Sequence, residues 1–279
     1  MPNAAPLPTR QVVLITGASS GIGRACAQAL HQAGYTVYGT SRRPDAHPDL
    51  PYPLLPLDVT DPDAAQAVVR TVHQREGRLD VLVNNAGWGI AGAIEDTTPE
   101  EALALFQVNF FGVHHMLRAA LPLMRAQGHG LVVNISSLAG RVGLPFQGFY
   151  SASKFALEGL SEALALEVAP FGIQVVVIAP GDFRTDFFNR RQRVAGFDAS
   201  AYREVAEQVL AAMEQDERRA PPPDAVARLL LRILRTPRPR FRYTVGAWVQ
   251  RAAVGLKGKV PDDWMLALSR MVYRIPKKA

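Results

Sequence analysis

Residues 11–23 read QVVLITGASSGIG, and this stretch decides the fold. QVVLIT is an apolar, β-branched run of the kind that forms a strand buried on both faces. Gly17, Gly21 and Gly23 follow it, and a helical pattern begins at Gly21. Glycine lets the backbone turn tightly and approach a pyrophosphate, while the helix N-terminus presents N–H groups to the anion. The stretch therefore predicts the first strand, turn and helix of a dinucleotide-binding sheet.

The remaining chain alternates short apolar runs with longer helical patterns. Strands are predicted at 11–16, 35–40, 53–58, 79–84, 130–136, 172–179 and about 241–245. Helices are predicted at about 21–34, 61–76, 99–127, 149–170, 199–218, 222–235 and 262–278. This alternation predicts an α/β fold with a Rossmann-type, doubly wound parallel sheet in a single domain. We expect the catalytic domain to span 10–245, with helices over the substrate at about 183–235, and a helical C-terminal extension at 246–279.

Composition and charge exclude several other classes of protein. The chain has 279 residues, of which 48% are hydrophobic and 20% charged, as in an ordinary globular protein. Cys26 is its only cysteine, so an intrachain disulfide is excluded, and the chain shows neither a secretory signal nor a spanning apolar run. We therefore expect a cytoplasmic protein. Eleven of the 31 basic residues lie within 235–279 against two acids, so the basic excess belongs to the tail and no nucleic-acid partner is expected.

Polar motifs follow the later strands, where a parallel sheet binds its ligands. They are Asn84-Asn85-Ala86-Gly87, Asn109 in LFQVNFFG, Ser136-Ser137, Tyr150-Ser151-Ala152-Ser153-Lys154 and Pro180-Gly181. Gly17-x-Ser19-x-Gly21 also matches a hydrolase nucleophile elbow, but no histidine lies after His129 to complete that triad. Adjacent His114 and His115 point to different helix faces without partner ligands, so no metal site is expected.

These motifs, in this order, resemble the short-chain dehydrogenase/reductase family over about residues 10–190. Residues 143–164 are especially similar to the branch that contains 17β-hydroxysteroid and retinol dehydrogenases. The resemblance implies an enzyme that transfers a hydride between a nicotinamide cofactor and an alcohol or ketone. It also implies a homodimer or homotetramer, paired through the helices at 99–127 and 149–170.

The spacing of Tyr150 and Lys154 suits proton transfer to a carbonyl oxygen. The two residues lie one helical turn apart on one face, and a cation there favours the phenolate and brings the tyrosine pKa nearer the working pH. Tyr150 is thus the expected acid/base and Lys154 its activator, while Ser137 would orient the substrate oxygen. By the resemblance, Lys154 also holds the nicotinamide ribose and Asn109 anchors a water in a proton relay.

Two arginines indicate which nicotinamide cofactor is used. Ser41-Arg42-Arg43 follows the second strand, where an enzyme that prefers NAD would place an acid for the ribose hydroxyl. Guanidinium groups there can pair with a 2′-phosphate, so NADP(H) is preferred over NAD(H), unless the arginines only face solvent. The expected cofactor-binding residues are Gly17, Ser19, Ser20, Gly21, Ile22, Gly23, Arg42, Arg43, Asp58, Val59, Asn85, Ala86, Gly87, Tyr150, Lys154, Pro180, Gly181 and Thr185.

Apolar residues near the motifs favour a hydrophobic substrate, a secondary alcohol or ketone of steroid, retinoid or fatty type. The expected substrate contacts are Ser137, Leu144, Phe146, Tyr150, Phe183 and Phe187, although the phenylalanines could instead only pack. A 3-oxoacyl or fatty-ketone reductase is the alternative enzyme. A catalytically idle NADP(H)-binding sensor or scaffold is the alternative of another class, and the intact Tyr150–Lys154 pair argues against it.

The basic tail carries a candidate amphipathic helix at 262–278. Trp264, Leu268, Met271 and Ile275 recur near helical spacing, with Arg270 and Arg274 in other directions. Such a helix could contact an anionic membrane surface peripherally. A subunit contact, or packing against the body of the protein, is the alternative.

Overall fold

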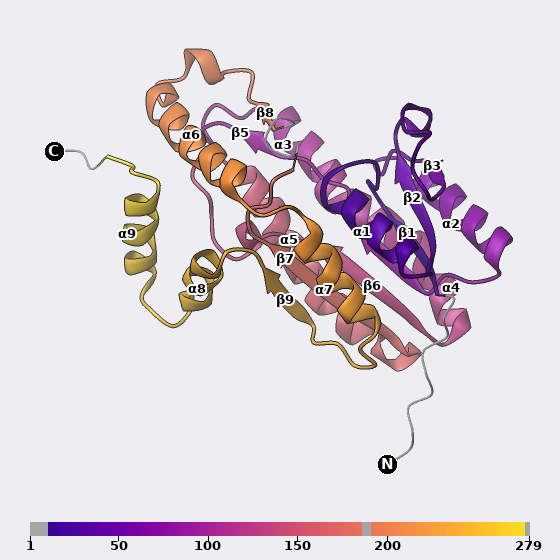
Figure 1. Ribbon diagram of the computed structural model, residues 1–279. Coiled ribbons are helices and arrows are strands. Elements are labelled where there is room, and N and C mark those ends of the chain that lie inside the picture. The colour runs from indigo at the N-terminus through magenta and orange to yellow at the C-terminus, as the bar shows by residue number, and fades with distance from the viewer. Residues whose placement is uncertain (1–10, 186–190, 277–279) are drawn as a thin grey trace.

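A seven-stranded parallel sheet forms the centre of the molecule. The computed structural model describes residues 11–185 and 191–276. The strands in spatial order are β3 (Leu54–Pro56), β2 (Thr36–Ser41), β1 (Val12–Ile15), β4 (Val81–Asn84), β6 (Gly130–Ile135), β7 (Ile173–Pro180) and β9 (Arg242–Val245). All six neighbouring pairs are parallel, which confirms the predicted doubly wound sheet (Figure 1).

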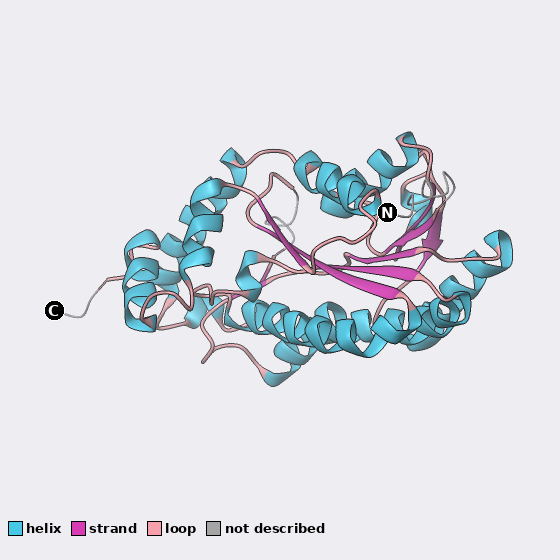
Figure 2. Ribbon diagram, turned by 90° about the horizontal axis from the view of Figure 1, so that it is seen from below, coloured by secondary structure: helices cyan, strands magenta, loops and turns pink. Residues whose placement is uncertain are grey.

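Helices cover both faces of this sheet (Figure 2). On one face, α1 (Gly21–Gln32) and α7 (Asp224–Leu234) bury a cluster that contains Leu30 and Leu230. On the other face, α2 (Pro62–Glu76), α4 (Gly112–Gln127) and α5 (Gly148–Val168) bury a second cluster. This double burial explains why the strands are apolar along their whole length.

The order of the strands creates a switch point between β1 and β4. From β1 the chain moves outward through β2 and β3, and then returns to β4 on the opposite side of β1. Helices that leave β1 and β4 on opposite sides open a crevice at the carboxyl ends of these strands. The glycine turn after β1 and the Asn85 segment after β4 meet in that crevice.

Several elements differ from the sequence-based prediction. The helix predicted at 99–127 is α3 (Pro99–Phe106), a π-helical turn η2 (Gln107–Phe111) and α4. Helix α6 (Arg203–Arg219) begins four residues later than predicted, because the 3-10 turn η5 (Phe197–Ala199) precedes it. Two short strands, β5 (Ile90–Ala91) and β8 (Gln192–Arg193), pair in a second small sheet that the sequence did not reveal.

The tail folds into two helices after β9. Helix α8 (Trp248–Leu256) was not predicted, and α9 (Asp262–Val272) covers the first part of the helix predicted at 262–278. Together α8 and α9, called the tail hairpin below, extend beyond the sheet as the gold and yellow helices of Figure 1. None of the described helices is both long and apolar enough to cross a bilayer.

Candidate active site

One long cavity follows the carboxyl edge of the sheet. Its volume is about 1880 Å³, and its wall runs from the glycine turn, past Tyr150 and Lys154, to the tail hairpin. Sites for a single small molecule usually measure about 300–1,000 Å³. The cavity is therefore large enough for a nucleotide and a substrate placed end to end.

The glycine turn has the shape that a phosphate cradle needs. Gly17 and Gly21 adopt φ values of +65° and +55°, which side chains disfavour. A Cβ on Gly23 would lie 2.4 Å from the carbonyl oxygen of Gly17 and 2.4 Å from Nδ2 of Asn85. The Asn85 amide donates to the carbonyl oxygens of Thr16 (2.9 Å) and Gly17 (3.2 Å), which joins the turn to the end of β4. Backbone, not side chain, thus forms this part of the wall.

The N-terminus of α1 favours a bound anion beside the glycine turn. Its first turn contains no acidic residue, so no carboxylate competes for the positive end of the helix dipole. Ser19, Ser20 and Ile22 line the cavity there, while Gly23 packs against Asn85 behind the wall. Thr185 also lines the cavity, and its Cβ lies near Gly21. The turn, the helix end and Thr185 therefore fit a pyrophosphate-containing cofactor.

Arg42 and Arg43 follow β2 on the cavity wall. Both side chains are exposed and both line the cavity, together with Asp58 and Val59 at the end of β3. Burial opposes the ionisation of Asp58, but hydrogen bonds from Thr60 and the charge of Arg42 outweigh it and hold the pKa of the carboxyl below its usual range. Arg42 therefore lies close enough to Asp58 to act on its charge.

Asn109 is completely buried in the π-helical turn η2. Its Oδ1 accepts a hydrogen bond from the Trp88 N–H (3.0 Å), and its Nδ2 donates to the Trp88 carbonyl (2.9 Å) and to Ser153 Oγ (3.2 Å). Single π-helical turns are frequent at functional sites because they re-aim a side chain within a helix. Here the turn directs Asn109 toward Gly87 and toward α5, which carries Lys154.

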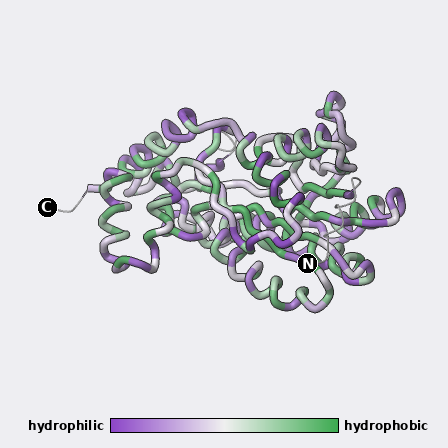
Figure 3. Tube along the Cα trace, turned by 60° about the horizontal axis from the view of Figure 1, so that its bottom comes forward, coloured by the Kyte–Doolittle hydropathy of each residue, from purple (hydrophilic) through white to green (hydrophobic). Residues whose placement is uncertain are grey.

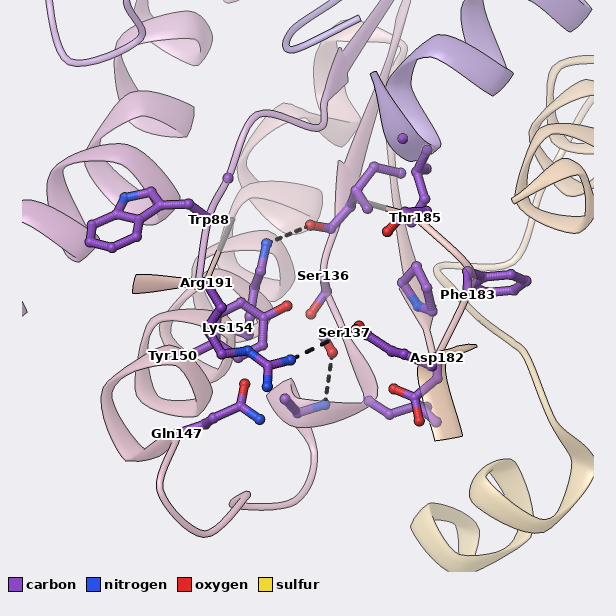
Figure 4. A pocket seen from close by; sticks show the side chains of 18 of the residues that line it. Trp88, Ser136, Ser137, Gln147, Tyr150, Lys154, Asp182, Phe183, Thr185 and Arg191 are labelled. Carbon is purple, nitrogen blue, oxygen red and sulfur yellow. Dashed lines mark hydrogen bonds and ion pairs between the residues drawn. The ribbon is translucent and has the colours of Figure 1, made fainter. Parts of the chain in front are cut away.

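Ser137, Tyr150 and Lys154 converge at the middle of the cavity (Figure 4). Ser137 follows β6, and its Oγ accepts from the Ala139 N–H at 3.1 Å. Tyr150 and Lys154 lie in the first two turns of α5, with the Lys154 ammonium 5.9 Å from the centre of the Tyr150 ring. Lys154 Nζ donates to the carbonyl of Ile135 at 3.0 Å. The structure thus brings together the three side chains expected to act on the substrate carbonyl.

The pKa of Tyr150 differs from the expectation. Burial raises it to about 12, and the hydrogen bond with Ser137 and the charge of Arg191 oppose this only in part. Burial lowers the pKa of Lys154 to about 8, against a smaller opposite effect of Glu158. The lowering expected from Lys154 is not among the causes of this shift, in which the burial of Tyr150 is the largest.

The structure places the residues expected to contact the substrate in different parts of the site. Leu144 lines the cavity, whereas Phe146 packs with Tyr150 in the cluster behind it, at a φ of +57°. Phe183 lines the cavity at one edge, but it is buried with the core around α7 and its ring points away from Tyr150 in Figure 4. Phe187 lies outside the described residues. Phe146 therefore supports the wall, and Phe183 belongs mainly to the core.

Three charged residues border Tyr150, and of these only Arg191 was considered from the sequence, as a contact for an acidic substrate or for water. Asp182 follows β7, Arg191 precedes β8, and Glu217 lies in the last turn of α6. All three line the cavity, and each exerts a charge effect on the pKa of Tyr150. The sequence offered one weak signal, because Asp182 directly follows the Pro180-Gly181 motif.

The tail hairpin and its neighbours were also missed as part of the site. Gln250 of α8 donates from Nε2 to Asp182 Oδ2 (2.5 Å) and accepts from the Asp182 N–H (3.2 Å). Val254 and Met265 line the cavity beyond it, and Met213 of α6 lines the opposite part of the wall, where Gln147 donates to its sulfur. The predicted extension at 246–279 thus contributes to the cavity.

Comparison with known proteins gives consistent matches. A family model for short chain dehydrogenases matches residues 11–195. A 3-ketodihydrosphingosine reductase from Bacteroides thetaiotaomicron is 43% identical over 95% of this chain and 98% of that protein. Human 17-beta-hydroxysteroid dehydrogenase type 1 is 34% identical over 97% and 88%. The crystal structure of a short-chain dehydrogenase from Streptomyces avermitilis is 37% identical, covers 96% of this chain and 100% of that one, and has a TM-score of 0.80.

Solved structures similar to this chain hold either form of the nicotinamide cofactor. A short chain dehydrogenase/reductase from Burkholderia phymatum in complex with NAD is 25% identical, covers 89% of this chain and 93% of that one, and has a TM-score of 0.77. A metagenomic short-chain oxidoreductase in complex with NADP is 29% identical, covers 86% and 98%, and has a TM-score of 0.67. A nicotinamide cofactor is therefore supported for this fold.

Proposed function

The chain belongs to the short-chain dehydrogenase/reductase family, and on that premise we propose that it uses NADPH to reduce the keto group of a long-chain aliphatic ketone to a secondary alcohol. It is an oxidoreductase with an NAD(P)-binding fold. The proposed substrate class includes the 3-ketodihydrosphingosine named for the Bacteroides relative.

The apolar continuation of the cavity beyond Tyr150 carries this proposal. Its wall is formed by Leu144, Met213, Val254, Met265, Leu268 and Val272, from the loop before α5, from α6 and from the tail hairpin. A flexible alkyl chain fits a long wall of aliphatic and methionine side chains, because each buried methylene contributes about 0.8 kcal/mol. A long wall made by three separate segments suits an extended chain better than a compact, rigid ring system.

The residues around Tyr150 would handle the proton in the reaction. When bound, the reduced cofactor supplies the hydride to the carbonyl carbon and leaves oxidised. Tyr150 gives its phenolic proton to the carbonyl oxygen, which completes the secondary alcohol, and a proton from water later restores the tyrosine. The Ser137 hydroxyl, which hydrogen-bonds to Tyr150 and accepts from the Ala139 N–H, would donate to the same oxygen once the ketone is bound. Lys154, whose ammonium lies next to the ring, stabilises the phenolate between the two proton transfers.

The proposed preference for NADPH rests on charge at the end of β2. Arg42 and Arg43 are exposed on the cavity wall, and no acidic side chain occupies their place. A doubly charged 2′-phosphate would gain charge-assisted hydrogen bonds from the two guanidiniums. The ribose hydroxyl of NADH offers them no such charge.

The test is NADPH oxidation by the purified protein with 3-ketodihydrosphingosine, a 3-oxoacyl thioester and a 17-ketosteroid. We expect the long-chain ketone to give the highest kcat/KM. Tyr150→Phe should lower its kcat by about 10²–10⁴-fold while NADPH binding is retained. Faster reduction of the steroid or thioester would replace the proposed substrate, and bound NADPH with no turnover of any ketone would favour an idle binding protein.

We propose that the tail hairpin contacts an anionic membrane surface. Trp248, Trp264, Leu266 and Met271 are each between 65% and 76% exposed, and apolar and polar segments alternate along the hairpin in Figure 3. Basic side chains lie nearby, among them exposed Arg270. Tryptophan and basic residues on one short hairpin favour the interface of an anionic bilayer. In flotation with liposomes, we expect the protein to associate with anionic vesicles but not with neutral ones. If it associates with neither kind of vesicle, the proposal is wrong.

We also propose a homodimer or homotetramer that pairs through α4 and α5. Phe111, directly before α4, and Leu166 on α5 are exposed, the latter to 79%. Exposed apolar residues on long neighbouring helices mark a surface that a second copy can cover. Light scattering should show a multimer for the native chain and a shift toward monomer for Leu166→Glu. A native monomer would contradict the proposal.

A further inference from the structure

We propose that Glu217, together with Asp182, binds a positively charged amino group of the substrate, carried on the carbon next to the keto group. This inference rests on the proposed function, because it concerns the ketone that Tyr150 reduces. It goes beyond that function by assigning a second recognition point, separate from the alkyl chain and from the keto oxygen.

The two carboxylates are placed beside the reacting carbonyl. Asp182 follows β7 and Glu217 lies in the last turn of α6, and both line the same cavity. Each raises the pKa of Tyr150 through its charge, which requires both to lie within electrostatic reach of the phenol. Figure 4 shows Asp182 on the side of Ser137 opposite to Lys154. A substituent next to a keto group held by Ser137 and Tyr150 would point into this region.

The described part of this region holds two carboxylates and one guanidinium that are largely shielded from water. The Arg191 guanidinium is 6% exposed and lies 4.0 Å from a carboxylate oxygen of Glu217, which is itself 12% exposed. One guanidinium therefore faces two carboxylates, Glu217 and Asp182. Burial and the charges of Asp182 and Glu214 raise the pKa of Glu217 to about 7, although Arg191 opposes the shift. Burial also raises the pKa of Asp182.

One acceptor atom in this group points to a missing donor. Oε2 of Glu217 is buried and accepts no hydrogen bond from any of the residues that the structure describes. Buried carboxylate oxygens normally have partners, because an unsatisfied one costs about 1–3 kcal/mol or more. An ammonium supplies three N–H donors and a positive charge, and so meets both the charge excess and the vacant acceptor.

This chemistry separates the possible ketones. 3-Ketodihydrosphingosine carries an amino group on the carbon beside its keto group, whereas a ketosteroid and a 3-oxoacyl thioester carry no cation there. A neutral substrate would leave the carboxylates buried against an apolar surface, which disfavours binding. The arrangement therefore selects a long-chain α-amino ketone among the aliphatic ketones that the cavity admits.

The test uses two substrates that differ only in this charge. 3-Ketodihydrosphingosine and its N-acetyl derivative, delivered in the same detergent, are reduced with saturating NADPH, and kcat/KM is measured for both. We expect the native protein to prefer the amine by at least about 10-fold. Glu217→Gln should lower kcat/KM for the amine by about 10- to 100-fold and leave the amide within about 3-fold.

Two further variants make the result specific. Asp182→Asn should reduce the preference in the same direction, and it tests the site independently if Glu217→Gln fails to fold. Glu204→Gln is the matched control, since Glu204 is an exposed glutamate on the same helix that does not line the cavity. It should leave both substrates unchanged. Thermal unfolding and NADPH binding of each variant report whether the fold and the cofactor site are intact.

The outcomes distinguish this inference from the proposed function. If the native protein reduces the amide as well as the amine, or if Glu217→Gln lowers both equally, the inference is overturned while the long-chain reductase remains. If neither long-chain ketone is reduced although NADPH binds, the proposed function fails and the inference fails with it.

Discussion

At the glycine turn after β1 the cavity wall is formed by backbone, whereas beyond Tyr150 it is lined by the side chains of α6 and the tail hairpin. We call these parts the nucleotide half (residues 16–60, 84–87 and Thr185) and the substrate half (residues 138–147, 182–183, 191–221 and 247–273). In the nucleotide half, Gly17, Gly21 and Gly23 allow close approach, and Asn85 holds the turn by bonds to carbonyl oxygens. In the substrate half, charged and aliphatic side chains come from segments far apart in sequence.

This difference shows that a short sequence motif can encode a cofactor site but not a substrate site. A pyrophosphate is the same in every nicotinamide cofactor, so one glycine turn at a helix end suffices for it. A substrate differs from enzyme to enzyme, so its site is formed by whichever loops and helices extend past the sheet. Changes in the two halves should therefore have separable effects, on cofactor affinity in one and on ketone selectivity in the other.

The largest separable effect is expected at Arg42 and Arg43. Replacing both with alanine removes the partners of a 2′-phosphate, so the Kd for NADPH should rise about 10- to 100-fold while that for NADH stays unchanged. Fluorescence titration with each cofactor measures both values. Arg70→Ala, an exposed arginine on α2 outside the cavity, is the control. An equal rise in the Kd for NADPH and for NADH would contradict the proposed preference for NADPH.

Lys154, on the boundary of the two halves, should make stability depend on pH. Burial lowers its pKa from 10.5 to about 8. Between these values the unfolded chain holds a proton that the folded chain has lost, so raising the pH favours the folded state. From about pH 8 to about pH 9.5 this contributes about 2 kcal/mol to the free energy of unfolding.

Urea unfolding at the two pH values measures this contribution. Lys154→Met keeps a similar length without a titratable group, so it should lack the rise that the native protein shows. The burial of Lys154 would be in doubt if both proteins gained the same stability. Any rise in the free energy of unfolding that the native protein and Lys154→Met share comes from other titratable groups.

The smallest effect is expected in the tail hairpin. Met265 is buried on the cavity wall, whereas its neighbour Leu266 is 65% exposed on the same helix. Met265→Ala should raise KM for the long-chain ketone about 3- to 10-fold through lost apolar contact, with the Kd for NADPH unchanged. Leu266→Ala should change neither value. An equal response of the two variants would show that the hairpin only packs against the body.

The nucleotide half was largely predictable from sequence because its signals are local. QVVLITGASSGIG contains the strand, the turn and the helix start in one run, and the parallel sheet was predicted correctly. The chemical roles assigned to Ser137, Tyr150 and Lys154 remain predictions, although the structure brings the three side chains together. Motifs that follow neighbouring parallel strands must meet at one edge of the sheet, and this made their proximity predictable.

The substrate half was not predictable for a physical reason. Glu217, Arg191 and Asp182 lie in segments with no motif of their own, and tertiary packing, in which α6 joins the apolar cluster around Tyr150, brings them to the same cavity. Sequence shows the lysine near Tyr150 but not the burial that raises the pKa of the tyrosine. The π-helical turn at Asn109 likewise depends on tertiary packing, not on helix periodicity.

The most direct test of the account follows the hydride itself. NADPH with deuterium at both C4 positions is incubated with 3-ketodihydrosphingosine and the protein, and the alcohol is analysed by mass spectrometry. With the native protein we expect an alcohol that carries one deuterium on the carbon that bore the keto group. With Tyr150→Phe this alcohol should be almost absent. An alcohol without deuterium, or no alcohol although NADPH is bound, would contradict it.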